Sequence, residues 1–375
     1  MKTNFWTSTE YGGFMQALMK QLGFLGIVAK QKFNLSEAAY RTALSRSARI
    51  ILRVRQYIFY PIQVIFSLSI DRIKGRSKYP VVVSTNTFFV PLIATFFNRK
   101  VIHLVYDLFP EAMTYSGKWI DGQIKVKFFR WIVYLTLKRA AINVFLGQRL
   151  KQYVESIHGD LNNSLIIPVG ADSGPFKEFT EIKSQKIRVL YCGNFGYMHD
   201  SVTLIKYLEN NSPKGIEFVF HCSGPKRKNL EDFRDSQKLY NTSSNSVVDC
   251  LKIADGLAHK EWAQTMKSAQ IALVTMSEGS ENVVMPSKTY SAMMAGQAIL
   301  AIAPEDSDLV DLIKQTDCGW WVNPGDINKL KDCIQEICQN HKAVTTRRKN
   351  AFKSAHKSFG QDQLAKKWSN LIKSL

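Results

Sequence analysis

Acidic side chains are scarce in this sequence. Its 375 residues include 50 Lys and Arg against 31 Asp and Glu, which gives a formal net charge of +19. A balance this basic indicates an anionic partner, which can be nucleic acid, an anionic membrane or an acidic substrate. The chain shows no recognised nucleic-acid-binding motif and no basic stretch interleaved with exposed aromatic residues. We therefore expect no nucleic-acid partner.

Other features are missing as well. The six cysteines form no CxxC pair and no His/Cys cluster with zinc spacing, so we expect reduced, buried thiols. The N-terminus lacks the basic-then-apolar pattern of a signal peptide. No run reaches the roughly 18 uncharged apolar residues that a transmembrane helix needs. These absences predict a cytoplasmic location.

The chain is long enough for two domains, and its 45% hydrophobic and 22% charged residues are typical of folded globular proteins. Short apolar runs alternate with amphipathic segments such as 121–140, a pattern that predicts parallel sheets covered by helices. The expected fold class is α/β, with two Rossmann-like, doubly wound domains and a cleft between them. The predicted strands are 81–85, 101–106, 142–146 and 164–169 in the first half, and 187–193, 217–224, 271–276 and 298–303 in the second.

The loop at 170–186 separates the two halves, because it contains glycines, a proline and mixed charges. The first domain is expected over 1–175 and the second over 185–349. A helical segment at 350–375, with a possible break at Gly360, belongs clearly to neither repeating unit. Ligands of open parallel sheets bind beyond the carboxyl ends of the strands, so candidate site residues are sought there.

In the first domain, Gly12 and Gly13 follow a weak strand and precede a helical run. Backbone amides at such a helix start can face a phosphate, although a plain turn explains two glycines equally well. Asp107 and Glu111 follow the strand that ends near Tyr106, which is the usual position of catalytic or substrate-binding carboxylates. A helix cap is the alternative role for Asp107.

In the second domain, Gly193 and Gly196 let the backbone approach a ligand after the strand 187–193, and His199 in the same loop is a candidate phosphate donor. The spacing is not that of a GxGxxG dinucleotide motif. Ser287 begins a predicted helix and puts Lys288 in its first turn, where a bound anion would explain a lysine. An exposed, solvated lysine is the alternative. Three consecutive basic residues at 226–228 are interpreted as a solvated turn.

With these motifs in place, the chain resembles the family 4 glycosyltransferases of the GT-B fold, which are retaining enzymes that use nucleotide-sugars without a required metal. The resemblance covers nearly the whole chain. It is carried by the Gly12-Gly13 turn and by the segments DLFPE at 107–111, INVFLGQRLKQYV at 142–154, VGADSGPF at 169–176, LYCGNFG at 190–196, SGPKRKNLE at 223–231, VVMPSKTYSAMMAGQAILA at 283–301 and GWWVNPGD at 319–326.

The resemblance implies that the second domain binds the nucleotide-sugar and the first holds the acceptor, with the final helix crossing back to the first domain. It implies no cofactor and no metal. The catalytic residues would be Asp107, Glu111 and Lys288. The donor-binding residues would be Gly12, Gly13, Gly193, Asn194, Gly196, His199, Ser287, Lys288 and Ser291.

The sequence departs from the family pattern where catalysis is concerned. Family members often carry two glutamates eight positions apart, and these positions hold Val283 and Ser291. The loop after the first strand of the donor domain usually supplies an arginine or lysine to the diphosphate, and it offers Asn194 and His199 instead. The frequent histidine before the aspartate corresponds to Tyr106.

Residues 41–70 contain five arginines and no acidic residue, interleaved with apolar side chains. The arginines are Arg41, Arg46, Arg49, Arg53 and Arg55. This composition is typical of a segment that lies on an anionic membrane surface, with about 1 kcal/mol per basic residue as the scale. An ordinary amphipathic helix packed on the sheet is the alternative.

The sequence therefore predicts a glycosyltransferase that moves a sugar from a nucleotide-sugar to a lipid-linked or polysaccharide acceptor. The expected setting is bacterial cell-surface polysaccharide biosynthesis, peripheral at the cytoplasmic face of the membrane. Two alternatives remain open. One is a nucleotide-sugar epimerase of the same fold, and the other is an inactive, transferase-like binding subunit, which the missing glutamate pair makes possible.

Overall fold

The computed structural model describes residues 1–36, 39, 45–85, 87–184, 186–240 and 249–375. The chain divides into two compact units. Unit 1 comprises Met1–Val169 together with Gln361–Leu375, and unit 2 comprises Gly170–Gly360. Each unit contains one six-stranded sheet in which all paired strands are parallel, as the predicted fold class requires.

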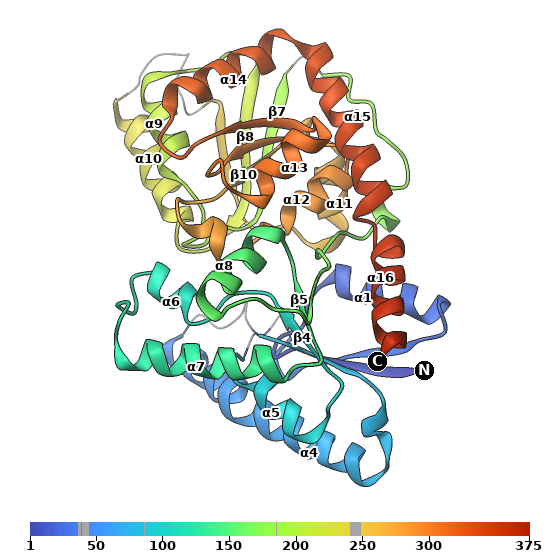
Figure 1. Ribbon diagram of the computed structural model, residues 1–375. Coiled ribbons are helices and arrows are strands. Elements are labelled where there is room, and N and C mark those ends of the chain that lie inside the picture. The colour runs from blue at the N-terminus through green and yellow to red at the C-terminus, as the bar shows by residue number, and fades with distance from the viewer. Residues whose placement is uncertain (37–38, 40–44, 86, 185, 241–248) are drawn as a thin grey trace. The chain divides into compact units, whose positions relative to one another are not determined.

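The sheet of unit 1 has the strand order β2-β1-β3-β4-β5-β6. Its strands are β1 (Lys2–Trp6), β2 (Val28–Lys32), β3 (Val81–Ser84), β4 (Val101–Val105), β5 (Ile142–Phe145) and β6 (Ser164–Ile166). The helices are α1 (Gly13–Phe24), α3 (Arg46–Val54), the π-helix η1 (Arg55–Phe59), α4 (Tyr60–Ile73), the 3₁₀ turn η2 (Arg76–Lys78), α5 (Val90–Phe97), α6 (Glu111–Tyr115), α7 (Ile124–Arg139), α8 (Gln148–His158) and α16 (Gln361–Ser374). Helices α4, α5 and α7 pack side by side, as Figure 1 shows.

The sheet of unit 2 has the order β12-β11-β10-β7-β8-β9. Its strands are β7 (Ile187–Asn194), β8 (Ile216–Ser223), β9 (Leu251–Ala254), β10 (Ile271–Thr275), β11 (Ala298–Ile302) and β12 (Gly319–Val322). The helices are the 3₁₀ turns η3 (Gly174–Phe176) and η5 (Ser280–Asn282), and α9 (Val202–Asn210), α10 (Arg227–Tyr240), α11 (His259–Lys267), α12 (Lys288–Met294), α13 (Asp308–Thr316), α14 (Ile327–Gln339) and α15 (His341–Ser358).

All eight predicted strands are present. Most of them, such as β3, β4, β10 and β11, are apolar runs buried along their whole length, whereas the edge strand β6 is partly exposed. Three strands were not predicted. The edge strand β2 has the sequence VAKQK and is partly exposed along its length, so no apolar run marks it. The strands β9 (LKIA) and β12 (GWWV) are the two edges of the unit 2 sheet. A lysine interrupts the first and a glycine begins the second, so neither stands out as a β-branched apolar run.

The predicted helical segment 350–375 is two helices, and only the second belongs to unit 1. The expected break falls at Gly360, which ends the stretch that forms part of unit 2. Helix α15 stays in unit 2 because its buried Arg348 donates to the carbonyl oxygens of Gly296 and Thr180, both at 2.8 Å. Helix α16 packs against α1, with Trp368 edge-on to Phe5.

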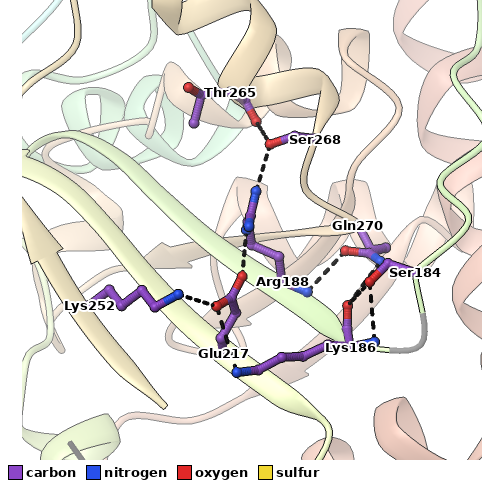
Figure 2. Close-up of polar contacts among 8 residues, drawn as sticks. All are labelled: Ser184, Lys186, Arg188, Glu217, Lys252, Thr265, Ser268 and Gln270. Atoms are coloured by element: carbon purple, nitrogen blue, oxygen red, sulfur yellow. Dashed lines mark hydrogen bonds and ion pairs between the residues drawn. The ribbon is translucent and has the colours of Figure 1, made fainter. Parts of the chain in front are cut away.

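The amino ends of the strands in unit 2 are held by a network around one carboxylate (Figure 2). Glu217 on β8 is 5% exposed and accepts hydrogen bonds from Arg188 Nε at 2.7 Å and from Lys252 Nζ at 2.8 Å. The Arg188 guanidinium also donates to Ser268 Oγ at 2.9 Å, and its backbone N–H donates to Gln270 Oε1 at 2.9 Å. The network links β7, β8 and β9 to the start of β10.

None of the six cysteines forms a disulfide, with Cys222, Cys250 and Cys318 buried and the other three partly buried. Burial raises the pKa of Cys222, Cys250 and Cys318 to about 11 in each case. The thiols are therefore protonated near neutral pH and take part in the core as small apolar groups.

Candidate functional site

Lys288 and the loop after β7 meet at the carboxyl edge of the sheet in unit 2. The Lys288 ammonium lies over the ring of Tyr191, with Nζ 3.9 Å from the ring centroid, and also contacts the Tyr191 hydroxyl. It lies 3.4 Å from the carbonyl oxygen of Asn194 and 3.4 Å from His199 Nε2. The structure thus brings together three of the predicted donor-site residues, Asn194, His199 and Lys288.

The partners of Lys288 are all uncharged. Among the described residues, Lys288 forms no ion pair with a carboxylate, and loss of solvent lowers its pKa to about 7. An ammonium group in such surroundings is stabilised by any anion that arrives beside it. The alternative that Lys288 is an exposed, solvated lysine does not match these contacts.

His199 is held by the opposite edge of its ring. Its Nδ1 lies 2.7 Å from the carbonyl oxygen of Thr275 at the end of β10. A carbonyl only accepts, so Nδ1 carries the proton and Nε2 presents its lone pair to Lys288. Burial and the nearby Lys288 lower the pKa of His199 to about 3. The neutral imidazole therefore has no proton on Nε2 to give a phosphate, and its role in this geometry is to position Lys288.

The glycines of this region allow two loops to approach each other closely. A Cβ on Gly224, which has a φ of +105°, would lie 2.3 Å from Asn194 Oδ1 and 2.8 Å from the carbonyl oxygen of Phe195. A Cβ on Gly196 would lie 3.1 Å from Asn194 Nδ2. The Asn194 side chain, although exposed, therefore lies directly against both glycines. Gly193 is exposed and has a φ of +130° with open space around it.

The loop after β8 supplies a residue that the sequence did not reveal. Lys226 Nζ donates to the carbonyl oxygen of His199 and, at 3.2 Å, to Ser277 Oγ. Desolvation lowers the pKa of Lys226. The three basic residues were interpreted together as a solvated turn, which is wrong for Lys226. Arg227 and Lys228 form ion pairs with carboxylates on the surface. Arg227 Nε lies 2.8 Å from Glu231 Oε1, and Lys228 Nζ lies 3.1 Å from Asp232 Oδ1.

Two of the remaining predicted donor residues lie on α12. Ser287 is exposed and immediately precedes the helix, and Ser291 is partly buried one turn further on. Val283, at the first position of the missing glutamate pair, is 3% exposed and belongs to the core. Neither position presents a carboxylate to the carboxyl edge of this sheet.

In unit 1, the turn at Gly12 lies close to Asp107. Gly12 caps the start of α1, and the preceding Tyr11 packs against Tyr106 with ring centroids 4.7 Å apart. Asp107 directly follows this tyrosine; its surface is exposed, but the surrounding protein reduces its solvation and raises the pKa of its carboxyl. The carboxyl ends of β1 and β4 therefore present the Gly12-Gly13 turn and a free-standing carboxylate to the same edge of the sheet.

Glu111, at the start of α6, is buried in unit 1. Its side chain is 2% exposed and accepts a hydrogen bond from Arg130 Nε at 2.8 Å. The Arg130 guanidinium also donates to Asp121 Oδ1 at 2.9 Å. Only one carboxylate oxygen is held by this arginine of α7, and Glu111 Oε2 is buried without a hydrogen-bond partner in the described part of the chain. The expectation that Glu111 orients a substrate hydroxyl stays a prediction.

His103 was expected to be a core histidine, and the structure agrees. It is 2% exposed on β4, its Nδ1 lies 2.9 Å from Asn143 Oδ1, and burial lowers its pKa to about 4. The adjacent cavity is small and mostly apolar. His103 therefore belongs to the core of unit 1.

The basic segment at 41–70 forms α3, η1 and α4, with Arg41 outside the described residues. Large apolar side chains are exposed along all three helices. They are Ile50, Ile51, Val54, Tyr57, Ile58, Phe59, Ile62 and Phe66. Arg55 is directed to Asn34, with Nη2 3.2 Å from its carbonyl oxygen. Among the described residues, no helix is both long and apolar enough to cross a membrane.

Comparisons with known proteins agree on the fold. No protein family model matches the chain. A probable glycosyltransferase of Pseudomonas aeruginosa, WbjE, is 22% identical over 325 residues, which cover 82% of this chain and 77% of that protein. The solved structure of HepE from Anabaena in complex with UDP covers 100% of both chains with a TM-score of 0.72 and 12% identity. WaaG, a glycosyltransferase involved in lipopolysaccharide biosynthesis, covers 99% of both chains with a TM-score of 0.64 and 13% identity. The chain has the GT-B fold of these proteins.

Proposed function

We infer that this chain, a glycosyltransferase by its relative and its GT-B fold, moves a sugar from a nucleotide-sugar to a lipid-linked or polysaccharide acceptor at the cytoplasmic membrane face. The proposed setting is the synthesis of bacterial cell-surface glycans. Support for the donor class comes from HepE, which has been solved with UDP and with UDP-glucose. We propose a retaining reaction that needs no resident metal.

The unpaired ammonium of Lys288 is the observation that carries this proposal. Sugar transfer requires the nucleoside diphosphate to leave with its negative charge stabilised. Lys288 is held at the carboxyl edge of the sheet by Tyr191, Asn194 and His199, all of them neutral. A diphosphate beside it gains a fixed positive charge without any rearrangement of the protein, and the charge acts strongly where solvent is reduced.

Lys226 is proposed as the second cation of the donor site. The family's usual arginine or lysine in the loop after the first donor-domain strand is absent, and Asn194 and His199 stand there. Lys226 reaches the same loop from the next strand and contacts the His199 backbone. Its side chain would therefore place a positive charge beside the β7 loop, where the missing residue would have placed one. Ser287, Ser291, Gly193 and Gly196 remain proposed donor contacts around these two lysines.

The acceptor is proposed to bind unit 1 at the Gly12 turn and Asp107. An exposed carboxylate accepts hydrogen bonds from hydroxyl groups, which suits a sugar or a glycan end. The Arg130–Glu111 pair behind it fixes the turn, with 2.8 Å between Nε and Oε1. We propose that Asp107 orients a hydroxyl in the reaction.

Activity over a panel of nucleotide-sugars tests the function directly. Each donor is incubated with the protein and a membrane extract, and both transfer to the extract and release of the nucleoside diphosphate are measured. Transfer that requires the extract supports the proposal. Conversion of the free nucleotide-sugar without an acceptor identifies an epimerase instead. Binding of a donor with neither reaction identifies an inactive binding subunit, which Val283 and Ser291 at the glutamate positions would explain.

The membrane location is tested with the apolar residues of α3 and η1. We expect the protein to sediment with anionic vesicles and not with neutral ones, because arginines and exposed apolar side chains alternate along these helices. The double variant Ile51→Ser/Ile58→Ser should lose most of this binding. Its matched control is Leu165→Ser/Val202→Ser, which removes two exposed apolar side chains elsewhere. Equal losses in both variants, or equal partitioning to neutral vesicles, would contradict the proposal.

A further inference from the structure

A second basic site lies in unit 1, at the amino ends of its strands. A hollow of about 580 Å³ opens there between the starts of β1, β2 and β3 and the connection from α4 to β3. Five basic side chains and one carboxylate line it. They are Lys2, Lys30, Lys74, Arg76 and Lys78, with Asp71. Ligands of parallel sheets are expected at the opposite, carboxyl ends, so this hollow is distinct from the site that holds Asp107 and the Gly12 turn.

The hollow lies on the face of the sheet that α4 covers further along. Side chains alternate along a strand, so Lys2 and Asn4 share a face with Trp6, which packs against Tyr60 of α4 with ring centroids 6.4 Å apart. In the parallel register Asn4 lies opposite Lys30. Where α4 ends, the apolar packing therefore gives way to lysine and asparagine. Positions of this kind in a covered parallel sheet are normally apolar.

The charges in the hollow are not balanced within the protein. Among the described residues, Lys2, Lys30 and Lys74 form no ion pair, and Arg76 reaches Asp71 only at 4.0 Å. The C-terminus of α4 contributes roughly half a negative charge near Lys74. This partial charge and one aspartate cannot offset five cations, which repel each other at this spacing. An external anion would stabilise this arrangement.

We propose that this hollow binds a phosphate-bearing anion with more than one negative charge. Four of its five cations are lysines, whose compact ammonium groups contact phosphate oxygens from any direction, whereas a single carboxylate would neutralise only one of them. The volume lies in the range of pockets that hold a small organic ligand. Asn98, at the rim, is buried, and its Nδ2 donates a hydrogen bond to the Tyr79 carbonyl oxygen at 2.9 Å. This bond fixes the wall of the hollow.

Two sources can present this chemistry, a lipid headgroup and a soluble phosphate compound. Ile73, at the end of α4 next to Lys74, is 85% exposed. An apolar side chain at this position can enter a bilayer whose headgroups occupy the hollow. The two sources are separated by using one soluble probe and one vesicle probe on the same variants.

The soluble arm titrates inorganic pyrophosphate into the full chain at low salt by calorimetry. The variant Lys30→Gln/Lys74→Gln removes two charges from the hollow. Its matched control, Lys366→Gln/Lys367→Gln, removes two exposed lysines from α16 in the same unit, outside the lining. We expect the hollow variant to bind pyrophosphate about tenfold more weakly than the control at this site. Equal affinities for the two variants would overturn the proposal.

The donor site is kept apart by a third protein, Lys288→Met. The proposal expects pyrophosphate binding at the hollow to survive in Lys288→Met, and UDP binding to survive in the hollow variant. If neither the wild type nor any variant binds UDP, the proposed function is contradicted, and the proposal of an anion site in the hollow is not affected. Loss of the hollow's pyrophosphate binding in Lys288→Met would contradict a second site.

The vesicle arm compares flotation with phosphatidylglycerol and phosphatidylcholine vesicles. If the ligand is a lipid headgroup, the hollow variant should lose several-fold of its binding to phosphatidylglycerol while the control keeps it. If the ligand is soluble, flotation of the hollow variant should match the control while pyrophosphate binding is lost. Both results support an anion site and assign its source. Unchanged binding in both arms excludes it.

Discussion

The two ends of the strands in unit 2 treat charge in opposite ways. At the amino end, Glu217 is bonded to Arg188 and Lys252, and every charge in the network has an opposite charge beside it. At the carboxyl end, the contacts of Lys288 and Lys226 within the described part of the chain are to carbonyl, hydroxyl and imidazole groups and to the Tyr191 ring. The strands β7 and β8 connect the two ends.

This difference indicates that the ligand binds at the carboxyl end of the sheet. A buried charge with its partner in place contributes to the folded state, and removing one member is costly. A desolvated charge without a partner is an unfavourable feature of the free protein that binding relieves. We therefore expect substitutions at the amino end to change stability and substitutions at the carboxyl end to change activity.

The largest effect is expected for Lys288→Met. Removal of the charge should lower turnover with saturating donor by about two to three orders of magnitude, because the leaving diphosphate loses its stabilisation. The unfolding free energy should not fall, because the ammonium that is removed is desolvated in the folded protein and has no carboxylate partner among the described residues. Turnover is measured by release of the nucleoside diphosphate, and stability by urea unfolding.

The control for Lys288→Met is Lys314→Met, which removes an exposed lysine from α13 of the same unit. Near-normal turnover in Lys288→Met, or an equal loss in the control, would remove Lys288 from the donor site.

A smaller effect is expected for Lys226→Met. Loss of its charge should lower kcat/KM for the donor about tenfold, the scale of one hydrogen bond from a charged group. The neighbouring Lys228→Met should have no effect, because Lys228 pairs with Asp232 on the surface at 3.1 Å. The two variants are compared in steady-state kinetics. Matching kinetics for both would restore the interpretation of residues 226–228 as a solvated turn.

At the amino end, Glu217→Gln should lower the unfolding free energy by about 1–2 kcal/mol, because Arg188 and Lys252 lose their shared counter-charge while staying partly solvated. Donor kinetics should not change. Urea midpoints are compared with those of Asp232→Asn, which breaks an exposed pair. If Glu217→Gln lost activity and kept its stability, the assignment of the amino end to stability would be wrong.

The smallest effect is expected in the pH dependence of stability. It concerns the difference in unfolding free energy between the wild type and Glu217→Gln. Desolvation opposes ionisation of Glu217, but the hydrogen bonds from Lys252 and Arg188 outweigh it and lower the pKa below 4.5. The stabilisation is therefore fully present above the unfolded pKa and is lost as pH falls through the folded one. The stability gap between the wild type and Glu217→Gln should shrink below about pH 4.5. A gap that grows on acidification would contradict the network.

The fold was largely predictable because its strands are buried. Runs such as 81–85 and 271–276 face helices on both sides, and this burial leaves a continuous apolar pattern in the sequence. The edge strand β2 leaves no such pattern, and it was missed. The break at Gly360 was visible, but the assignment of α15 to unit 2 depends on Arg348 reaching Gly296, more than fifty positions away.

The site residues were predictable only where a local sequence motif marks them. Lys288 follows a Pro-Ser pair at a helix start, a local signal. Lys226 reaches the loop after β7 because Gly224 lets the loop after β8 approach it closely. The residues next to Lys226 in the sequence do not indicate this contact. The burial of Glu111 depends on Arg130, nineteen positions later and on another helix. Such long-range pairings are set by packing, so local sequence patterns cannot reveal them.

The most direct test of the donor site is the uptake of protons when UDP binds. Lys288 has a pKa of about 7 in the free protein, and a bound diphosphate raises it, so binding at pH 8 must take up protons and the affinity must fall as pH rises above 7. Calorimetry in buffers of different ionisation enthalpy measures this uptake. We expect close to one proton per UDP for the wild type and for Glu217→Gln, and none for Lys288→Met. UDP binding with the same proton uptake in Lys288→Met would contradict this expectation.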